Sequence, residues 1–368
     1  MTEKLKTLLH ERASSVDFVA PDLDALVRAG DRQVRRRRGL GIAGGLAAAV
    51  VTALVVPVLG SDAPRDQLAV EPARTAPVTW VSGSVLHMPD SETDLGFAVQ
   101  TYVRTASGYV FADTGGTVWS RVDGATTEVG RAPARDARLV SDTESTLAGW
   151  VDPSGDRPAF VVLDQSTGKV TRYDEHTTSD MALLADERDP ALFAAIDGGS
   201  AYWRDQRGAV VVDLASREAR VVDADAGGFD LGPMEDGLFA FRDGSATAIG
   251  EGPDDIVRRI DAYGELGSFS PDARYFSSDA NRPQVYDVAS GRRVSFDLDG
   301  RRFATGYEWL DDRTIAMLAA RRPTMDAKAE LLTCTVPEGT CDLVAELGTF
   351  ERIQSSFALP IGQSIAAQ

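Results

Sequence analysis

Two cysteines are the residues whose spacing implies chemistry most directly. Cys334 and Cys341 are the only cysteines in the 368-residue chain, and they lie seven positions apart in LLTCTVPEGTCDL. Alternating apolar residues on both sides and a Pro-Glu-Gly turn (337–339) between them predict a β-hairpin. A hairpin places the two sulfurs opposite one another on neighbouring strands. The sequence therefore predicts a disulfide, which persists in an oxidising compartment outside the cytoplasm.

Histidines and acids show no comparable pattern. A metal site at the cysteines needs further Cys or His ligands, and none lies near them in the sequence. We expect His87 to be a half-exposed strand residue and His176 to be solvated, and the chain contains no H-x-x-x-H and no G-x-S-x-G motif. Acid pairs at 254–255 and 311–312 are typical of turns that bond their own backbone. Glycosidase carboxylates could lie among the many acids, but nothing selects two of them. We predict no catalytic, cofactor-binding or metal-binding residue, and no cofactor.

An uncharged apolar run precedes this part of the chain. Residues 39–60 read GLGIAGGLAAAVVTALVVPVLG, and a helix of that length extends roughly 33 Å, enough to cross a bilayer core. Four arginines (Arg35, Arg36, Arg37 and Arg38) lie immediately before it. Because basic residues stay on the cytoplasmic side, we predict one transmembrane helix with residues 1–38 inside and everything after it outside.

Other interpretations of this run stay open. A buried core helix can be equally apolar, although four consecutive arginines are an unusual flank for one. A cleavable signal peptide has the same order of basic and apolar residues, but the 38-residue leader is long for it and no clean A-x-A site follows Pro57. The letters RRGL (37–40) resemble a twin-arginine export signal. Gly41 and Gly45 have the G-x-x-x-G spacing of close helix pairs, which also arises by chance in a Gly/Ala-rich helix.

Charge is divided unevenly along the chain. Residues 1–38 contain nine Lys and Arg and six Asp and Glu, a net charge of +3. Since the whole chain has a net charge of −18 and residues 39–60 have none, residues 61–368 have a net charge of −21. An acidic exterior disfavours nucleic acid and anionic lipid surfaces as partners. We therefore predict two partners: the membrane, in which the chain is an integral protein, and an unidentified protein. We predict no nucleic-acid partner.

The cytoplasmic segment has a helical pattern. Pro21 is a good first-turn residue, and Leu23, Leu26 and Val27 begin an amphipathic stripe. Helices this short are not stable alone. Two interpretations stay open: a juxtamembrane segment whose arginines lie at lipid headgroups, and a docking element for a cytoplasmic protein.

Beyond the apolar run, residues 61–78 are rich in Pro, Ala and charge and predict an extended linker. From residue 79, short apolar runs broken by Gly, Asp, Ser and Pro predict an all-β domain. Three segments repeat: VVLDQSTGKV (161–170), VVVDLASREA (210–219) and QVYDVASGRR (284–293). Each predicts a strand that ends in Asp, a tight turn and a return strand.

Weaker copies of this repeat extend over the whole domain. The equivalent positions are 87, 120, 164, 213, 250, 287 and 334, with an average spacing of about 41. A period of about 40–45 with four strands per unit is typical of a β-propeller. The runs 350–360 and 79–88 each supply part of a blade, so we expect them to share one sheet that closes the ring. We predict seven four-stranded blades over residues 79–361, followed by a tail (362–368). Six or eight blades stay open, because the unit 230–261 is poorly patterned.

One repeat carries a family resemblance. SPDARYF (270–276), followed by QVYDVASGRR, resembles the repeat of TolB-like and WD40-like periplasmic propellers, S-P-D-G-[RK] and then a strand ending in D-x-x-[ST]-G. The resemblance covers residues 79–360 as architecture and implies no catalytic residue. With its basic tail and apolar run, the chain resembles actinobacterial-type single-pass surface proteins with a WD40-like exterior. That type implies binding or sensing outside, sometimes linked to sigma-factor systems, but this chain lacks the H-x-x-x-C-x-x-C motif of zinc-type anti-sigma factors.

Two functions follow as hypotheses. The first is a non-enzymatic, membrane-anchored binding module that can transmit a signal through residues 1–38. The second is an extracytoplasmic, hydrolase-like propeller enzyme with its chemistry at the mouth of the central channel. A buried acid or histidine with a shifted pKa in the channel would favour the enzyme, and an apolar or flat mouth would favour the binding module. The expected localisation is the cell membrane, single-pass, with the N-terminus in the cytoplasm.

Overall fold

The structure is a computed structural model that describes residues 76–181, 191–226, 231–244, 246–260, 267–278, 284–353 and 357–364. By its contacts the chain divides into two units, Met1–Ala69 and Val70–Gln368, and every described residue belongs to the second. The predicted cytoplasmic tail, the predicted transmembrane helix with Arg35–Arg38 before it, and most of the predicted linker lie outside the described residues. Within the described ranges no helix has the length and apolar character needed to cross a membrane.

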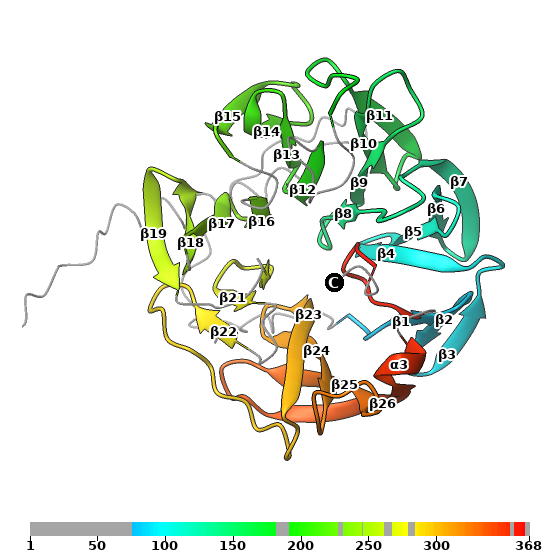
Figure 1. The fold of residues 1–368 in the computed structure, drawn as a ribbon, viewed down its shortest axis with the longest axis vertical. Helices are drawn as coiled ribbons and strands as arrows, with labels where there is room; N and C mark the ends of the chain where they lie inside the picture. Colours follow the sequence, from blue (N-terminus) through cyan, green and yellow to red (C-terminus); the bar gives the residue numbers. More distant parts are fainter. Residues whose placement is uncertain are drawn as a thin grey trace, which may run out of the picture. The chain divides into compact units, whose positions relative to one another are not determined.

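Seven small antiparallel sheets make up the second unit, and Figure 1 shows them following one another around a ring. We number them as blades and name the strand nearest the ring centre first. Blade 1 contains β4 (Val99–Thr105), β5 (Gly108–Asp113), β6 (Thr117–Val122) and β7 (Ala125–Arg131). Blade 2 contains β8 (Leu139–Ser141), β9 (Leu147–Asp152), β10 (Ala159–Asp164) and β11 (Lys169–Tyr173). Blade 3 contains β12 (Leu192–Asp197), β13 (Ser200–Asp205), β14 (Gly208–Asp213) and β15 (Ala219–Asp223). Blade 4 contains β16 (Leu231–Glu235), β17 (Leu238–Asp243), β18 (Ala246–Gly252) and β19 (Asp255–Ile260). Blade 5 contains β20 (Ser268–Phe269), β21 (Tyr275–Ser278) and β22 (Gln284–Asp287). Blade 6 contains β23 (Phe303–Asp311), β24 (Thr314–Ala320), β25 (Lys328–Thr335) and β26 (Cys341–Thr349). Blade 7 contains β27 (Phe357–Ala358), β1 (Trp80–Ser82), β2 (Val85–Met88) and β3 (Ser91–Asp94).

The seven-bladed, all-β prediction is confirmed. Each of the seven equivalent positions counted in the sequence lies on the third strand of a different blade. The turn chemistry is also as predicted, because the Asp213 carboxylate accepts N–H bonds from Ala215 (3.0 Å) and Ser216 (2.7 Å). Four residues after each Asp, the backbone is left-handed, with φ of 68° at Gly168, 63° at Arg217 and 70° at Gly291. This conformation reverses the chain into the fourth strand.

Both ends of the domain contribute to blade 7, as the sequence predicts. β27 supplies the inner strand and pairs antiparallel with β1, with Ala358 opposite Val81. The run 350–360 is not one strand, however, because it begins with the helical turn α3 (Phe350–Ile353). The turn puts Phe350 and Ile353 on one face, and both pack into the same apolar cluster at blade 6. Burial of these two side chains explains why the helical turn replaces the strand.

The packed domain includes residues just outside the predicted range 79–361. Val78 is buried, and the Ala76 N–H donates to the carbonyl of Leu310 on β23 at 3.1 Å. At the other end, Gly362 donates to the carbonyl of Tyr102 (3.0 Å) and accepts from the Leu139 N–H (2.8 Å). These bonds connect the chain ends to blades 6, 1 and 2.

Blade 5 differs most from the repeat, although it carries the clearest SPDARYF motif. Its sheet has three strands among the described residues, whereas the poorly patterned unit 230–261 supplies a regular four-stranded blade 4. After β22 the chain still pairs briefly with that strand: the Asp287 N–H donates to the carbonyl of Arg292 (2.9 Å), and the Val294 N–H donates to the carbonyl of Val285 (2.7 Å). The Asp297 N–H then donates to Gly339 of the blade 6 hairpin (2.8 Å). The fourth-strand segment is therefore diverted to a neighbouring blade.

The core lies between adjacent blades, and tryptophans fill much of it. Trp150 packs between blades 1 and 2, Trp203 between blades 2 and 3, and Trp309 between blades 5 and 6. All three are at least 95% buried, which fits the packing role expected of large aromatic side chains.

Candidate functional site

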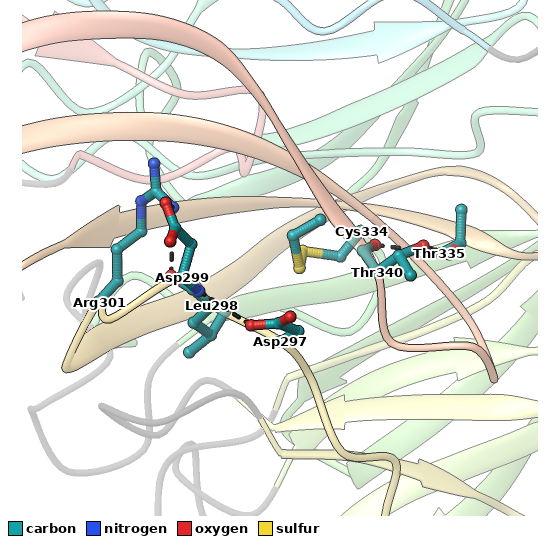
Figure 2. The surroundings of a disulfide bond; sticks show 8 residues. Asp297, Leu298, Asp299, Arg301, Cys334, Thr335 and Thr340 are labelled. Carbon is teal, nitrogen blue, oxygen red and sulfur yellow. Dashed lines mark hydrogen bonds and ion pairs between the residues drawn. A yellow bond between two sulfur atoms is a disulfide. The ribbon is translucent and has the colours of Figure 1, made fainter.

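The predicted disulfide between Cys334 and Cys341 is confirmed. The two residues are direct cross-strand partners on β25 and β26 and are joined through their sulfurs. Cys334 is fully buried in the apolar cluster between blades 5 and 6, and Leu298, labelled in Figure 2, packs against the same cluster. In the same hairpin, a Cβ on Gly339 would come within 1.8 Å of the Ser295 carbonyl, so only glycine allows this contact. The disulfide therefore reinforces the hairpin that receives the diverted segment of blade 5.

The two histidines occupy the environments that the sequence predicts. His87 is partly exposed on β2, stacks on Trp80 at 5.1 Å and has its Nδ1 3.1 Å from Glu92. His176 is exposed in the loop after β11. Across the described ranges, no group of three or more His, Cys, Asp or Glu side chains is placed to hold a metal ion.

A buried ion pair crosses the inner side of the ring. Arg104 on β4 and Glu308 on β23 belong to blades 1 and 6, on either side of blade 7. Arg104 Nε donates to Glu308 Oε1 at 2.6 Å, and Arg104 Nη2 donates to the Trp309 carbonyl at 3.3 Å. Their side chains are only 13% and 5% exposed. The pair therefore ties together two blades that are not neighbours in the ring.

Burial controls the titration of this region. It raises the pKa of Glu308, and the Arg104 guanidinium opposes the shift. Burial also raises the pKa of Tyr102 and of Tyr307 well above 10.0. Within the part of the chain that the structure describes, Glu308 Oε2 and the Tyr307 hydroxyl have no hydrogen-bond partner. Glu308 is therefore a buried acid with a shifted pKa, the feature that would favour the enzyme hypothesis. Its carboxyl group, however, is only 6% exposed to solvent.

A pocket of about 200 Å³ lies elsewhere, between the outer strands of blades 2 and 3. Its apolar part includes Trp203 and Phe160, whose rings stack with centroids 4.6 Å apart, and Tyr173 at 5.4 Å from Trp203. These rings also form the core between the two blades. Because Phe160, Trp203 and Tyr173 are only 1%, 2% and 6% exposed, only a small part of each ring belongs to the wall of the pocket.

The rest of the pocket wall includes four charged side chains, Glu175, Asp205, Arg207 and Arg217, together with His176, Thr177, Val212 and Ala219. The side chain of Asp205 is 1% exposed. Its carboxylate accepts hydrogen bonds from Arg207 Nε (3.0 Å), Arg207 Nη2 (2.6 Å) and Trp203 Nε1 (3.1 Å). Arg217 Nη1 lies 3.3 Å from Glu175, and its guanidinium carbon lies 4.9 Å from the centre of the Tyr173 ring. The pocket thus combines small exposed parts of three aromatic rings with guanidinium groups, an arrangement suited to an anion with an apolar part.

Sequence reasoning missed both of these places. Arg104 and Glu308 are 204 positions apart, so no local pattern connects them. The pocket has one signal in the sequence. Four residues after the Asp of the repeat, two copies have glycine (Gly168 and Gly291), whereas the copy at 210–219 has Arg217. A left-handed turn favours glycine, so the arginine is a departure from the two sister copies.

Comparisons with known proteins find similarity only among solved structures. No family model matches the sequence, and no curated protein does. Apo AztD from Citrobacter koseri is 12% identical, with 78% of this chain and 99% of that chain covered and a TM-score of 0.45. TolB from Acinetobacter baumannii is 14% identical, with 74% and 65% covered and a TM-score of 0.41. The tricorn protease is 12% identical, with 71% of this chain covered and a TM-score of 0.44, and the match spans 33% of that longer chain. Similarities this low say nothing about what the present chain binds.

Proposed function

We propose that this chain is a single-pass membrane protein whose seven-bladed propeller lies outside the cytoplasm and acts as a non-enzymatic binding module. In this proposal residues 39–60 anchor the protein, Arg35–Arg38 keep residues 1–38 in the cytoplasm, and those residues transmit the bound state. The arrangement resembles actinobacterial-type surface proteins with a WD40-like exterior. Its bound partner is a protein, consistent with the acidic exterior that disfavours nucleic acid.

The observation that carries the location is the disulfide between Cys334 and Cys341. Disulfides persist in oxidising compartments and are rare in the cytoplasm, where thiols are kept reduced. The arginine cluster and the apolar run point to the same side of the membrane through different residues and different physics. Two independent features therefore support an external propeller.

The burial of Glu308 argues against its use as a general acid. A general acid must reach its substrate, within hydrogen-bond distance or through one water. Glu308 is 6% exposed, and one of its oxygens is held by Arg104 at 2.6 Å. In this arrangement the carboxyl group serves as a tie between blades 1 and 6.

The enzyme alternative has one specific observation in its favour: Glu308 has a raised pKa and a second oxygen, Oε2, without a described partner. If the ring interior opened to admit a substrate, this group could donate a proton. A set of chromogenic esters and glycosides tests this alternative. Turnover by the full chain that disappears in Glu308→Gln, while the variant stays folded, would favour the enzyme over the binding module.

Topology is tested with a reporter that is active only outside the cytoplasm, fused after Gln368. The fusion should be active, and replacing Arg35, Arg36, Arg37 and Arg38 together should reduce its activity because the orientation signal is weakened. An expressed but inactive fusion would count against the external propeller. Thiol labelling of non-reduced protein in whole cells is the second readout, and modification of both cysteines would contradict the disulfide.

Partner binding is tested by cross-linking in cells that express the full chain or a matched chain ending at residue 78. Both carry the same tail and anchor, and only the first carries the propeller. A protein captured by the full chain and lost with the shortened one would support the binding module. Equal capture by both would show that the propeller is not the binding element.

A further inference from the structure

One turn of the propeller has an unusual residue. The turns after Asp164, Asp213 and Asp287 share one geometry, and two of them have glycine at the left-handed position. The third has Arg217, with φ of 63°. A side chain with a Cβ rarely adopts this conformation. The arginine therefore occupies a position where glycine would fold more easily.

The side chain of Arg217 is directed into the pocket between blades 2 and 3. Its guanidinium lies over the Tyr173 ring, and its Nη1 is 3.3 Å from Glu175. The Arg217 and Glu175 side chains are 53% and 56% exposed, so water can replace either partner. Nε and Nη2 of Arg217 have no partner among the residues that the structure describes. Arg217 thus offers free N–H donors at a fixed place.

The opposite charges in the pocket are not equally available. Asp205 is buried and has its oxygens occupied by Arg207 and the Trp203 indole N–H. Arg207 uses Nε and Nη2 for Asp205, and within the described ranges its Nη1 makes no bond. A bound molecule therefore meets guanidinium donors first, and Glu175 is the one carboxylate of these pairs that it can displace.

We propose that this pocket binds a small organic carboxylate that carries one apolar ring. The ring lies in the aromatic part of the pocket beside Trp203, and the carboxylate displaces Glu175 from Arg217. A volume of about 200 Å³ suits a single ring. This site goes beyond the proposed function and does not depend on it, because all of its residues lie within the described propeller.

A cation or a neutral molecule fits less well. The face of Tyr173, which would attract a cation, is already covered by Arg217. A neutral amide would lose the charge-assisted bonds that a carboxylate makes with a guanidinium, which are about twice as strong as neutral ones. The site therefore distinguishes ligands of one shape by their charge.

The experiment uses the full 368-residue chain in a mild detergent and three ligands of nearly equal size: benzoate, benzamide and benzylamine. Saturation-transfer NMR titrations give a dissociation constant for each. We expect saturable benzoate binding, with benzamide and benzylamine bound at least ~10-fold more weakly. Absence of saturable benzoate binding, or equal affinity for the three, would overturn the proposal.

Three variants assign the binding to the pocket. Arg217→Gly reproduces the turn of the sister repeats, so it should fold while benzoate affinity falls about 10-fold. Glu175→Gln removes the competing carboxylate and should raise the affinity. Arg220→Gln is the matched control, because it also removes one positive charge but from an exposed residue of β15 outside the pocket. It should leave benzoate affinity unchanged.

The opposite signs expected at Arg217 and Glu175 exclude a merely structural effect, because loss of structure would weaken binding in both variants. If Arg217→Gly folds poorly, Arg217→Asn replaces it, since asparagine also tolerates the left-handed conformation. Folding is checked by the thermal midpoint of each variant. Affinity that is unchanged in a folded Arg217 variant, or reduced equally in the Arg220 control, would contradict the site.

Discussion

Two arginine–carboxylate pairs join separate blades of this propeller, and they differ mainly in their access to water. Arg104 and Glu308 lie 2.6 Å apart with side chains 13% and 5% exposed, whereas Arg217 and Glu175 lie 3.3 Å apart with side chains 53% and 56% exposed. Removing one partner of a buried pair leaves an unpaired charge in a medium of low dielectric and costs about 3–5 kcal/mol. An exposed pair contributes roughly 0.2–1 kcal/mol, because water replaces the lost partner.

The comparison separates a structural contact from an exchangeable one. The buried pair connects blades 1 and 6 and has little to gain from any other partner. The exposed pair holds Arg217 over Tyr173, yet it can open at low cost when a better acceptor arrives. Similar chemistry thus stabilises the ring at one place and leaves a binding site at the other.

The largest effect is expected from opening the ring around the buried pair. Deleting residues 350–368 removes β27 and leaves β1 with unpaired backbone groups, while the apolar face against blade 6 becomes wet. We expect the whole propeller to lose protease resistance, so that fragments arise from all blades in limited proteolysis. A truncated chain as resistant as the full one would show that the closing strand is dispensable.

The next effect concerns the buried pair itself. Arg104→Met keeps much of the side-chain volume but leaves Glu308 buried without its cation, and it should lower the free energy of unfolding by about 3–5 kcal/mol. Glu308→Gln is the matched control: its amide oxygen can still accept from Arg104, so the loss should be near 1 kcal/mol. Chemical denaturation at neutral pH measures both. Equal losses in the two variants would contradict a charge-based tie.

A smaller effect should appear as a pH dependence. Because burial raises the pKa of Glu308 in the folded state, this carboxyl group keeps its proton to a higher pH in the folded protein than in the unfolded chain, where its pKa is 4.5. The contribution of Glu308 is therefore fully present below pH 4.5 and is lost as the pH rises through the folded pKa, with a slope of at most about 1.4 kcal/mol per pH unit. The measurement is the difference in unfolding free energy between the native chain and Glu308→Gln across this window. A difference that grows with pH would have the wrong sign.

The smallest effect is expected at the exposed pair. Arg217→Gly relieves a left-handed backbone, worth about 1 kcal/mol, and removes a surface ion pair worth roughly 0.2–1 kcal/mol. The two terms nearly cancel, so the unfolding free energy should change by less than about 1 kcal/mol in either direction. Arg217→Ala keeps the strained left-handed backbone and loses the ion pair with Glu175. We therefore expect it to be less stable than Arg217→Gly. A large loss in Arg217→Gly would make this pair structural and remove the distinction drawn above.

Local patterns in the sequence determined much of the fold. The Asp that ends a third strand and the left-handed residue four positions later create a turn through bonds within a few residues, as Asp213 and Ser216 show. Such turns recur with a period of about 41, which is why the blade count could be predicted. The disulfide at Cys334 follows from the same logic, because a hairpin sets the register of its own strands.

The tertiary structure alone decided the rest. The α3 turn follows from burial at blade 6. Among the described residues blade 5 has three strands, because the segment after β22 leaves its sheet for the next hairpin, where the Asp297 N–H donates to the Gly339 carbonyl. Arg104 meets Glu308 across 204 positions, and Arg217 meets Tyr173 and Glu175 from a different blade. No local pattern identifies the partners in these contacts, because each depends on where whole blades are placed when the ring closes. Interactions within a turn are encoded by neighbouring residues, whereas burial and interblade charge pairing exist only once the blades pack.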